Sequence, residues 1–187
     1  MKKSTIIVLL VIIFLGNSCK KKSDPALVLG QSYQGGIIAY LDQTGNHGLI
    51  AAEADLSNTS WGCQGVILGA VSKAYGSGLN NTNIITGNCS YSTSAARMCS
   101  DLIFNGYSDW FLPTIDELQL LYQNLYLKGK GNFATDLPYW SSSEALSNDI
   151  APNVIPQIHA WRIGMSGGGW SCPNKEGLAK VRPCRYF

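Results

Sequence analysis

The stretch that decides the fold is residues 106–125, GYSDWFLPTIDELQLLYQNL. Its first half contains the apolar residues 110–112 and ends at Pro113, and a helix is predicted to begin directly afterwards at Thr114. Thr114 and Glu117 have the spacing of a capping box, in which each residue bonds the backbone of the other. The apolar residues of this helix recur at intervals of three and four, and the stripe they form is Leu118, Leu121, Tyr122 and Leu125. The stretch therefore predicts a buried segment that leads into an amphipathic helix.

Towards the N-terminus the chain predicts a β-hairpin, a long irregular segment and a shorter first helix. Residues 34–42 and 47–53 carry the apolar pattern of strands, with turn-forming residues between them. Residues 54–90 are rich in Gly, Asn, Ser and Thr and show no clear period, and a short helical turn within residues 69–83 is the one regular element they suggest. A helix is predicted over 93–104, because apolar residues recur there at helical spacing and Asn-Gly follows as a stop signal.

Towards the C-terminus the pattern is one of strands separated by loops. Strands are predicted over 139–144, 158–163 and 179–186, with a flexible Gly-rich loop at 167–169. Pro183 cannot donate a backbone hydrogen bond, so its part of the last strand is predicted to be an exposed edge or a bulge. A hairpin, two helices and then antiparallel strands with long loops indicate an α+β fold rather than an alternating parallel one.

The N-terminal segment has the three parts of a secretion signal. Two lysines (2–3) precede an apolar run (5–15), and small or polar residues (16–18) lead into Cys19. The run is much shorter than the roughly 20 residues that span a bilayer as a helix. The pattern resembles the lipobox of bacterial lipoproteins, which implies cleavage after a signal peptide of residues 1–18 and lipidation of Cys19. An ordinary signal that leaves Cys19 unmodified is the alternative.

The remaining chain divides into a short tether and one domain. Residues 19–30 are predicted to be the lipidated cysteine and a flexible tether, and residues 31–187 the domain. Five of the fourteen basic residues but only one of the twelve acidic residues lie before residue 30. The domain therefore keeps nine basic and eleven acidic residues, a net charge of −2. Nothing in that balance attracts nucleic acid, so no nucleic-acid partner is expected.

The cysteines indicate an oxidising compartment. Five follow the lipobox, and this odd number leaves at least one without an intramolecular partner. Cys99 lies on the apolar face of the first predicted helix, where a small buried thiol fits. We therefore expect Cys99 to be free and the disulfides to be Cys63–Cys89 and Cys172–Cys184, although sequence alone does not determine connectivity.

Seven motifs, in this order, resemble one known family. They are residues 35–41, 47–52, 61–63, 95–99, 106–113 with 116–118, 139–144 and 181–185. Together they resemble the Lcl C-terminal domain family, named for the end domain of a bacterial collagen-like adhesin, and the match covers nearly all of residues 31–187. The resemblance implies an extracellular domain with a C-type-lectin-like fold, which is shared with formylglycine-generating enzymes and bacterial adhesin tips.

The chain departs from the family in ways that bear on function. The founding adhesin is linked to sulfated glycosaminoglycans, but this chain has no collagen repeat and its domain is net acidic. Both differences weaken any transfer of polyanion binding. Cys184 stands where the family has an apolar residue, which is consistent with an additional Cys172–Cys184 disulfide.

Motifs for common catalytic and metal chemistry are sparse. His47 and His159 have no second histidine at ligand spacing, so zinc is not expected, and neither a nucleophile elbow nor a phosphate-binding loop occurs. Residues 141–143 precede Glu144 and raise the idea of a serine nucleophile, but hydroxyls bonded within a strand explain them better.

Calcium is the one metal that the acidic residues suggest, without the spacing of an EF-hand. The candidate ligands are Asp109 and Glu144, with Asp116 and Glu117 nearby in the sequence. The alternative is structural: Asp109 in a turn, Glu117 in the capping box, and Glu144 opposite one of the C-terminal arginines, Arg182 or Arg185. No other cofactor is expected.

The tryptophans divide into core and surface candidates. Those predicted to be buried are Trp61, packed against a disulfide, Trp110 and Trp140. Trp161 and Trp170 flank the Gly-rich loop and are predicted to be partly exposed, and with Arg162 they are the candidate ligand contacts. Exposed aromatic rings stack on sugar rings, as in other adaptable binding surfaces.

These observations predict an envelope-anchored, non-enzymatic binding module. Its expected partners are the membrane, through the lipid, and a glycan or extracellular protein, as for an adhesin. The expected location is the outer membrane, on its surface or its periplasmic face. Two alternatives remain: an enzyme like the formylglycine-generating proteins, with Cys172 and Cys184 as its copper-binding pair, and a structural subunit of a surface complex.

Overall fold

Two β-sheets and three α-helices make up the computed structural model, which describes residues 25–149 and 153–187. The signal peptide (1–18), Cys19 and the tether up to residue 24 lie outside the described residues. The elements are β1 (Ser32–Tyr33), β2 (Gly36–Leu41), β3 (Gly48–Ala51), β4 (Leu56–Thr59), α1 (Gly78–Asn88), α2 (Ala95–Ser100), α3 (Ile115–Asn124), η1 (Tyr126–Lys128), β5 (Tyr139–Glu144), β6 (Ala160–Ile163), β7 (Trp170–Ser171), β8 (Ala179–Val181) and β9 (Cys184–Tyr186). This arrangement confirms the predicted α+β class.

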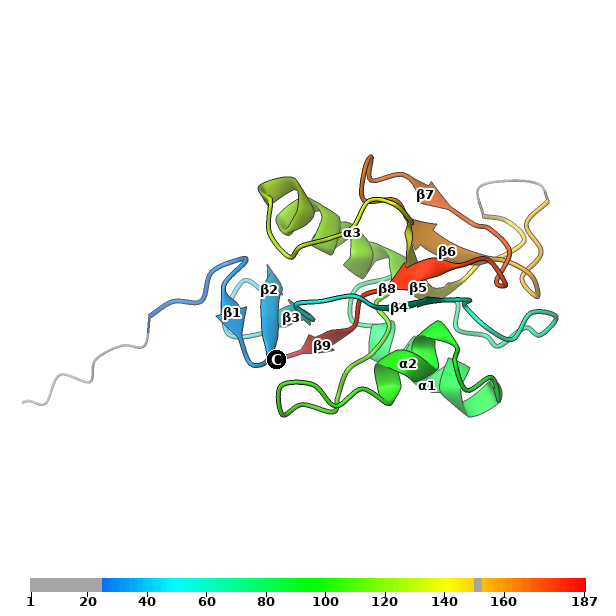
Figure 1. The fold of residues 1–187 in the computed structure, drawn as a ribbon, viewed down its shortest axis with the longest axis horizontal. Coiled ribbons are helices and arrows are strands. Elements are labelled where there is room, and N and C mark those ends of the chain that lie inside the picture. The colour runs from blue at the N-terminus through cyan, green and yellow to red at the C-terminus, as the bar shows by residue number, and fades with distance from the viewer. Residues whose placement is uncertain (1–24, 150–152) are drawn as a thin grey trace, which may run out of the picture.

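The first sheet has the strand order β1-β2-β3-β9 and is antiparallel throughout. Its centre is the predicted N-terminal hairpin, β2 and β3. The last strand, β9, pairs with β3, placing Leu49 opposite Tyr186 and Ile50 opposite Arg185. The beginning of the described chain and the C-terminus therefore lie at the same end of the molecule (Figure 1).

The second sheet has the order β4-β8-β5-β6-β7. Its pairs are antiparallel except β5 with β8, where Tyr139 lies opposite Lys180 in a parallel pair. The prediction of purely antiparallel strands is therefore wrong at this point. The strand predicted over 179–186 is divided at Pro183, because β8 belongs to the second sheet and β9 to the first. The carbonyl of Pro183 accepts a hydrogen bond from Ala52 N (2.9 Å), so this residue connects the sheets without donating to either.

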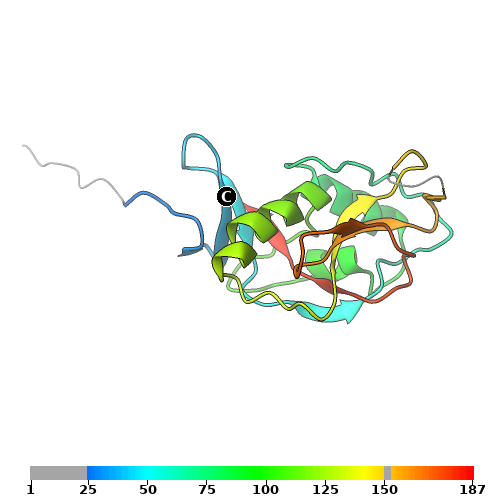
Figure 2. The same ribbon diagram turned by 90° about the horizontal axis from the view of Figure 1, so that it is seen from above.

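Helix α3 confirms the prediction drawn from residues 106–125. Thr114 Oγ1 accepts a hydrogen bond from Glu117 N (3.2 Å), and Glu117 Oε2 accepts one from Thr114 N (2.8 Å), which completes the capping box. Leu118, Leu121 and Leu125 are fully buried. The helix contacts β2 of the first sheet and β5 and β6 of the second, so it covers the junction of the two sheets (Figure 2).

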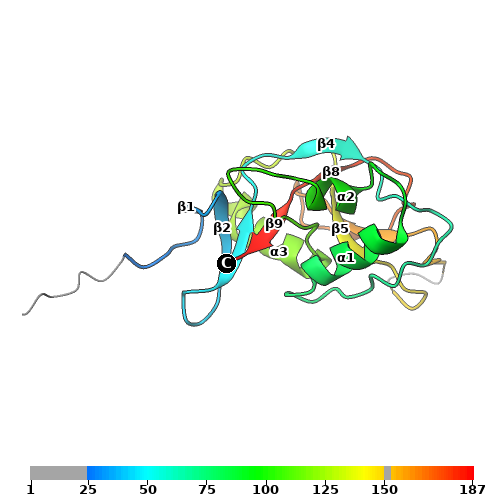
Figure 3. The ribbon, with the colours of Figure 1, turned by 90° about the horizontal axis from the view of Figure 1, so that it is seen from below.

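Helices α1 and α2 pack together beside the second sheet (Figure 3). The helix predicted over 93–104 is shorter: α2 begins after Ser94, whose Oγ accepts a hydrogen bond from Arg97 N (3.3 Å). Helix α1 lies in the segment predicted to be irregular. Its sequence is rich in Asn, Thr and Gly, which are weak helix formers. Tertiary bonds hold it instead, such as Leu112 N to Thr82 Oγ1 (3.0 Å).

The core lies on both sides of the second sheet. One buried cluster lies under α3 and another under α1 and α2, while a third, smaller cluster joins Trp110 to Ile50 of the first sheet and to Ala52, which follows β3. Trp61, Trp110 and Trp140 are buried as predicted, and Trp61 belongs to the same cluster as the cysteines of the disulfide. Within residues 25–149 and 153–187, no helix has the length and apolar character needed to cross a membrane.

Candidate functional site

A hollow of about 640 Å³ lies beside the disulfide between Cys63 and Cys89. The structure confirms this predicted pair, whose Cα atoms are 5.8 Å apart. The walls come from three separate loops: one after β4, one between α1 and α2, and one between β7 and β8. The side chains that line the hollow are Ser60, Cys63, Gln64, Ser90, Tyr91, Ser92 and Glu176.

The floor of the hollow depends on a close backbone approach at Gly62. Gly62 has φ +97°, and a Cβ atom there would lie 2.6 Å from Ser94 Cβ and 3.4 Å from the Tyr91 ring. Glycine is therefore required for both the conformation and the space. The preceding Trp61 is buried, and its Nε1 donates to Ser141 O (2.7 Å), which fastens this loop to β5.

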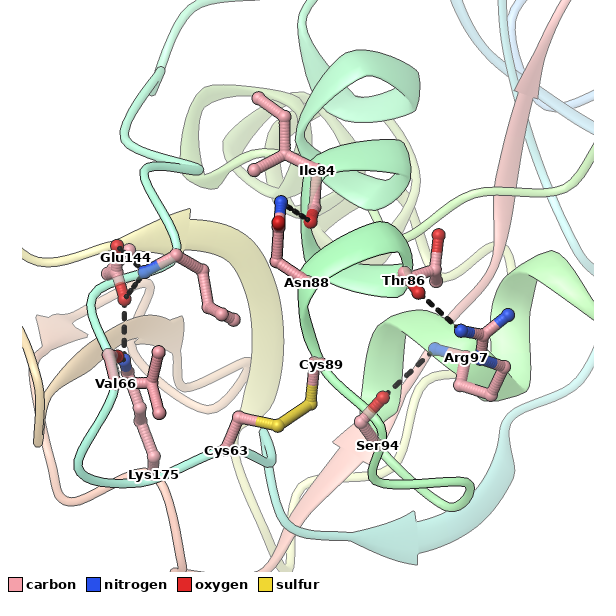
Figure 4. Close-up of a disulfide and its surroundings, with 11 residues drawn as sticks. Cys63, Val66, Ile84, Thr86, Asn88, Cys89, Ser94, Arg97, Glu144 and Lys175 are labelled. Carbon is pink, nitrogen blue, oxygen red and sulfur yellow. Dashed lines mark hydrogen bonds and ion pairs between the residues drawn. A yellow bond between two sulfur atoms is a disulfide. The ribbon is translucent and has the colours of Figure 1, made fainter.

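A buried ion pair holds the loop that follows Cys63. Glu144 at the end of β5 and Lys175 lie 2.5 Å apart, and both side chains are fully inaccessible. Lys175 Nζ also donates to Val66 O (3.0 Å), while the Glu144 carboxylate accepts hydrogen bonds from Leu68 N (3.1 Å) and Gly69 N (2.8 Å). Figure 4 shows Val66, Glu144 and Lys175 gathered at one side of the disulfide, with Ser94 and Arg97 at the other. The loop is thus fixed both covalently and electrostatically.

Polar groups at the rim form a network of their own. In the amide orientation that satisfies both of its ends, Gln64 Nε2 donates to Glu176 Oε2 (3.2 Å) and to Asn174 Oδ1 (2.5 Å). Glu176 N also donates to Asn174 Oδ1 (2.8 Å). No described lysine or arginine lies within ion-pair distance of Glu176. The rim therefore presents an uncompensated negative charge.

Trp161 and Trp170, the aromatic pair predicted from sequence, lie in contact, but only one of them is exposed to solvent as predicted. The rings of Trp161 and Trp170 meet edge to face with centroids 5.8 Å apart. Trp161 is only 2% exposed, so its predicted partial exposure is wrong, while Trp170 is 39% exposed. Trp161 is buried because its ring packs into the core cluster under α3, where its Nε1 donates to Asp149 (2.9 Å) and the Lys73 ammonium lies over its ring (4.5 Å).

The polar atoms of this aromatic surface are already bonded within the protein. Trp170 Nε1 donates to Gln119 Oε1 (2.7 Å), and Arg162 Nε donates to Ser171 Oγ (3.1 Å). The Arg162 guanidinium lies 5.8 Å from the ring centroid of Trp140. The exposed face of Trp170 is what this surface offers a ligand.

The predicted Cys172–Cys184 disulfide is wrong, because both cysteines are free. Cys184 is buried in β9 of the first sheet, whereas Cys172 follows β7 at the edge of the second. Burial, with Asp149 nearby, raises the pKa of the Cys172 thiol to about 12. Burial also raises the pKa of Cys184 well above its usual value. Cys99 is free and buried, as predicted.

The calcium candidates are occupied by protein partners in separate places. Asp109 accepts two hydrogen bonds from Arg185 (2.7 and 2.9 Å), and these lower the pKa of its carboxyl group. Glu144 is opposite Lys175, not opposite either C-terminal arginine as the structural alternative expected. The described ranges contain no cluster of three or more His, Cys, Asp or Glu that could hold a metal ion.

The serines before Glu144 are bonded within the strand environment. Ser141 Oγ donates to Trp161 O and Ser143 Oγ to Ser72 O, both at 2.8 Å. All three serines of this run are fully buried. These hydroxyls therefore stabilise the packing of β5.

Sequence reasoning missed the residues of the hollow, above all Gln64, Tyr91 and Glu176. The available signal was indirect: residues 54–90 form a long loop-rich segment beside two cysteines, and binding residues are frequent on loops that a rigid scaffold positions. No family model matches this chain, and none of the curated proteins searched is similar to it.

Proposed function

We propose that this chain is a lipid-anchored, non-enzymatic binding module of the bacterial outer membrane that recognises a glycan or an extracellular protein. The observation that carries the proposal is the polar hollow beside the Cys63–Cys89 disulfide, built on a fixed loop. The C-type-lectin-like identity of the fold, suggested by the seven motifs, is part of the same proposal. The α+β architecture with long loops is compatible with it.

The position of the hollow suits presentation to an external ligand. The described chain begins at the β1 end of the molecule, while the loop after β4 and helices α1 and α2 lie toward the other end (Figures 1 and 3). Lipidated Cys19 would stand six residues before Pro25, a spacing of about 20 Å at full extension. A short tether of this kind would hold the β1 end near the membrane and point the hollow away from it.

The rigidity of the loop favours binding. A loop that must be ordered on binding costs conformational entropy, and a preformed one avoids that cost. Here the loop is fixed before any ligand arrives, by Cys63, Glu144 and Lys175. The thiols do not favour the alternative enzyme, because nucleophilic cysteines have lowered pKa values, whereas those of Cys172 and Cys184 are raised.

Two measurements test the anchored module. The intact mass of the protein from bacterial membranes should show cleavage before Cys19 and acyl chains on that residue. A membrane-impermeant protease applied to intact cells then reports whether the domain faces outward. Cleavage after Ser18 with an unmodified Cys19 overturns the lipid anchor.

Ligand recognition needs its own test. The full chain, in detergent, is applied to a glycan array and is used separately to capture envelope and host surface proteins. Specific binding in either experiment is expected. An absence of binding above background in both overturns the binding function.

A further inference from the structure

The hollow beside the disulfide has a distinctive chemical composition. It presents the hydroxyl groups of three serines, one amide, one carboxylate, the aromatic ring and hydroxyl of a tyrosine, and a disulfide-bonded cysteine, and no cation lines it. Its volume of about 640 Å³ lies within the range of small-molecule sites, about 300–1,000 Å³. Hydroxyls and amides bind ligands by adaptable hydrogen bonds, and an aromatic ring adds a flat apolar face. This combination suits a molecule that has both hydroxyl groups and an apolar ring face.

The aromatic ring is that of Tyr91, which is 49% exposed. Among the described residues Tyr91 has no aromatic partner, whereas the similarly exposed Tyr75 packs against Tyr40 and Tyr186. The backbone of Tyr91 is held in place, because its carbonyl accepts a hydrogen bond from Ser94 N (3.2 Å). The ring lies beside Gly62, makes no aromatic contact among the described residues and is half exposed, so part of it is available for stacking.

The charge of the hollow decides the class of ligand. Glu176 is exposed, has no cationic partner among the described residues, and is oriented by Gln64 at 3.2 Å. A carboxylate accepts strong hydrogen bonds from hydroxyl groups. It repels sulfate and carboxylate groups, and no lysine or arginine of the lining compensates for that repulsion. A sulfated sugar is thus disfavoured, and a neutral one is accommodated.

We infer that the hollow binds a neutral pyranose unit of a glycan, with the Tyr91 ring stacked on the C–H face of the sugar, and with the Glu176 carboxylate and Gln64 Oε1 accepting hydrogen bonds from its hydroxyl groups. The inference rests on the proposed binding function and names its ligand class and its site. It differs from the expectation that the family resemblance raises, which is a sulfated glycosaminoglycan.

The test begins with the full chain in detergent on an array of neutral oligosaccharides that end in glucose, galactose or mannose, together with heparin and chondroitin sulfate. The tightest neutral oligosaccharide is then titrated by calorimetry against variants. Tyr91→Ala should weaken binding about tenfold through loss of stacking. Glu176→Gln should weaken it at least about tenfold through loss of charge-assisted bonds. Both side chains are exposed, so the thermal midpoint of each variant should remain that of the wild type.

Two matched variants serve as controls. Glu53→Gln makes the same change at an exposed carboxylate that lines a different hollow, and Trp170→Ala removes the exposed ring of the other surface. Neither should alter the affinity. A preference for heparin or chondroitin sulfate, or loss of binding with Trp170→Ala but not with Tyr91→Ala, overturns the inference and leaves the binding function standing. Binding to no glycan and no protein overturns both.

Discussion

The hollow beside the disulfide and the Trp161–Trp170 surface differ in how their polar groups are used. At the aromatic surface the indole N–H groups of Trp161 and Trp170 donate to Asp149 and Gln119, so both donors are already bonded within the protein. At the hollow Gln64 also donates to Glu176 and Asn174, but the hydroxyl groups of the lining serines make no hydrogen bond within the described residues and remain available to a ligand. If the hollow is the binding site, as proposed, free polar groups on a fixed backbone mark that site better than aromatic residues near a flexible loop do.

The interactions that hold the two regions in place also differ. The hollow depends on a disulfide and a fully buried ion pair, whereas the aromatic surface depends on Asp149, whose side chain is 10% exposed, and on Lys73, which is 32% exposed. Substitutions of the residues that hold the hollow should therefore lower the stability of the fold more than substitutions of those that hold the aromatic surface. Four experiments test that ranking, and they follow in order of expected effect.

The largest effect is expected from Glu144→Gln, which leaves Lys175 charged and buried without its partner. Removing one member of a buried pair costs about 3–5 kcal/mol, and here two backbone amides lose a charged acceptor as well. Urea unfolding followed by tryptophan fluorescence measures the change. As a control, Asp101→Asn breaks an exposed pair with Arg97 and should leave the free energy of unfolding unchanged. A loss below about 1 kcal/mol for Glu144→Gln contradicts a structural role for the pair.

Replacing both Cys63 and Cys89 by serine should lower the free energy of unfolding by about 3 kcal/mol, because the disulfide closes a loop across a separation of 26 residues. The same urea titration applies. Cys172→Ser is the matched control, since this cysteine is free and half-buried. If the single control variant loses as much stability as the double variant, the disulfide does not support the hollow.

Gly62→Ala should cost about 2 kcal/mol, because alanine meets both a left-handed backbone conformation and a clash with Ser94. Gly65→Ala is a precise control: its φ of +88° is similar, but nothing lies within 4 Å of the added Cβ. It should cost only the conformational part, about 1 kcal/mol. Thermal unfolding of the two variants separates the contributions, and equal losses would show that the space at Gly62 is not needed.

The smallest effect is expected for Asp149→Asn at the aromatic surface, through the pH dependence of the protein's stability. Burial opposes ionisation of Asp149, but hydrogen bonds from Leu146 N and Trp161 and the ion pair with Lys73 outweigh it and lower its pKa below 3.8. Because the folded pKa is below the unfolded one, this stabilisation is present above the unfolded value and is lost as pH falls through the folded value. The stability advantage of wild type over Asp149→Asn should therefore shrink below about pH 4. A difference that stays constant from neutral to acidic pH would exclude this linkage.

Elements with strong local signals could be predicted from the sequence. Helix α3 has its capping box and apolar stripe, and the β2–β3 hairpin has its alternation, so both were predicted close to their true bounds. Helix α1 was not, because residues such as Thr82 hold it through tertiary bonds that local propensity does not reveal. The split of the last strand at Pro183 was also missed, since it depends on which sheet has a free edge.

The candidate site could be predicted only in part. The Cys63–Cys89 disulfide was predicted correctly, but the residues of the hollow come from three loops far apart in the sequence. Glu144 was expected to face a C-terminal arginine, and its partner proved to be Lys175 in a loop with no regular pattern. Pairings across such distances arise from chain topology, which periodicity does not encode.

The pairing of β3 with β9 ties the maturation of the protein to the last element of the fold. If, as proposed, the chain is exported N-terminus first, the hairpin of β2 and β3 emerges early while its partner strand is still on the other side of the membrane. Until β9 arrives, β3 presents an unpaired edge, which is a template for aggregation. Contacts of such long sequence separation also form slowly. Envelope chaperones that cover strand edges should therefore matter more for this protein than for one whose sheets are built from neighbouring segments.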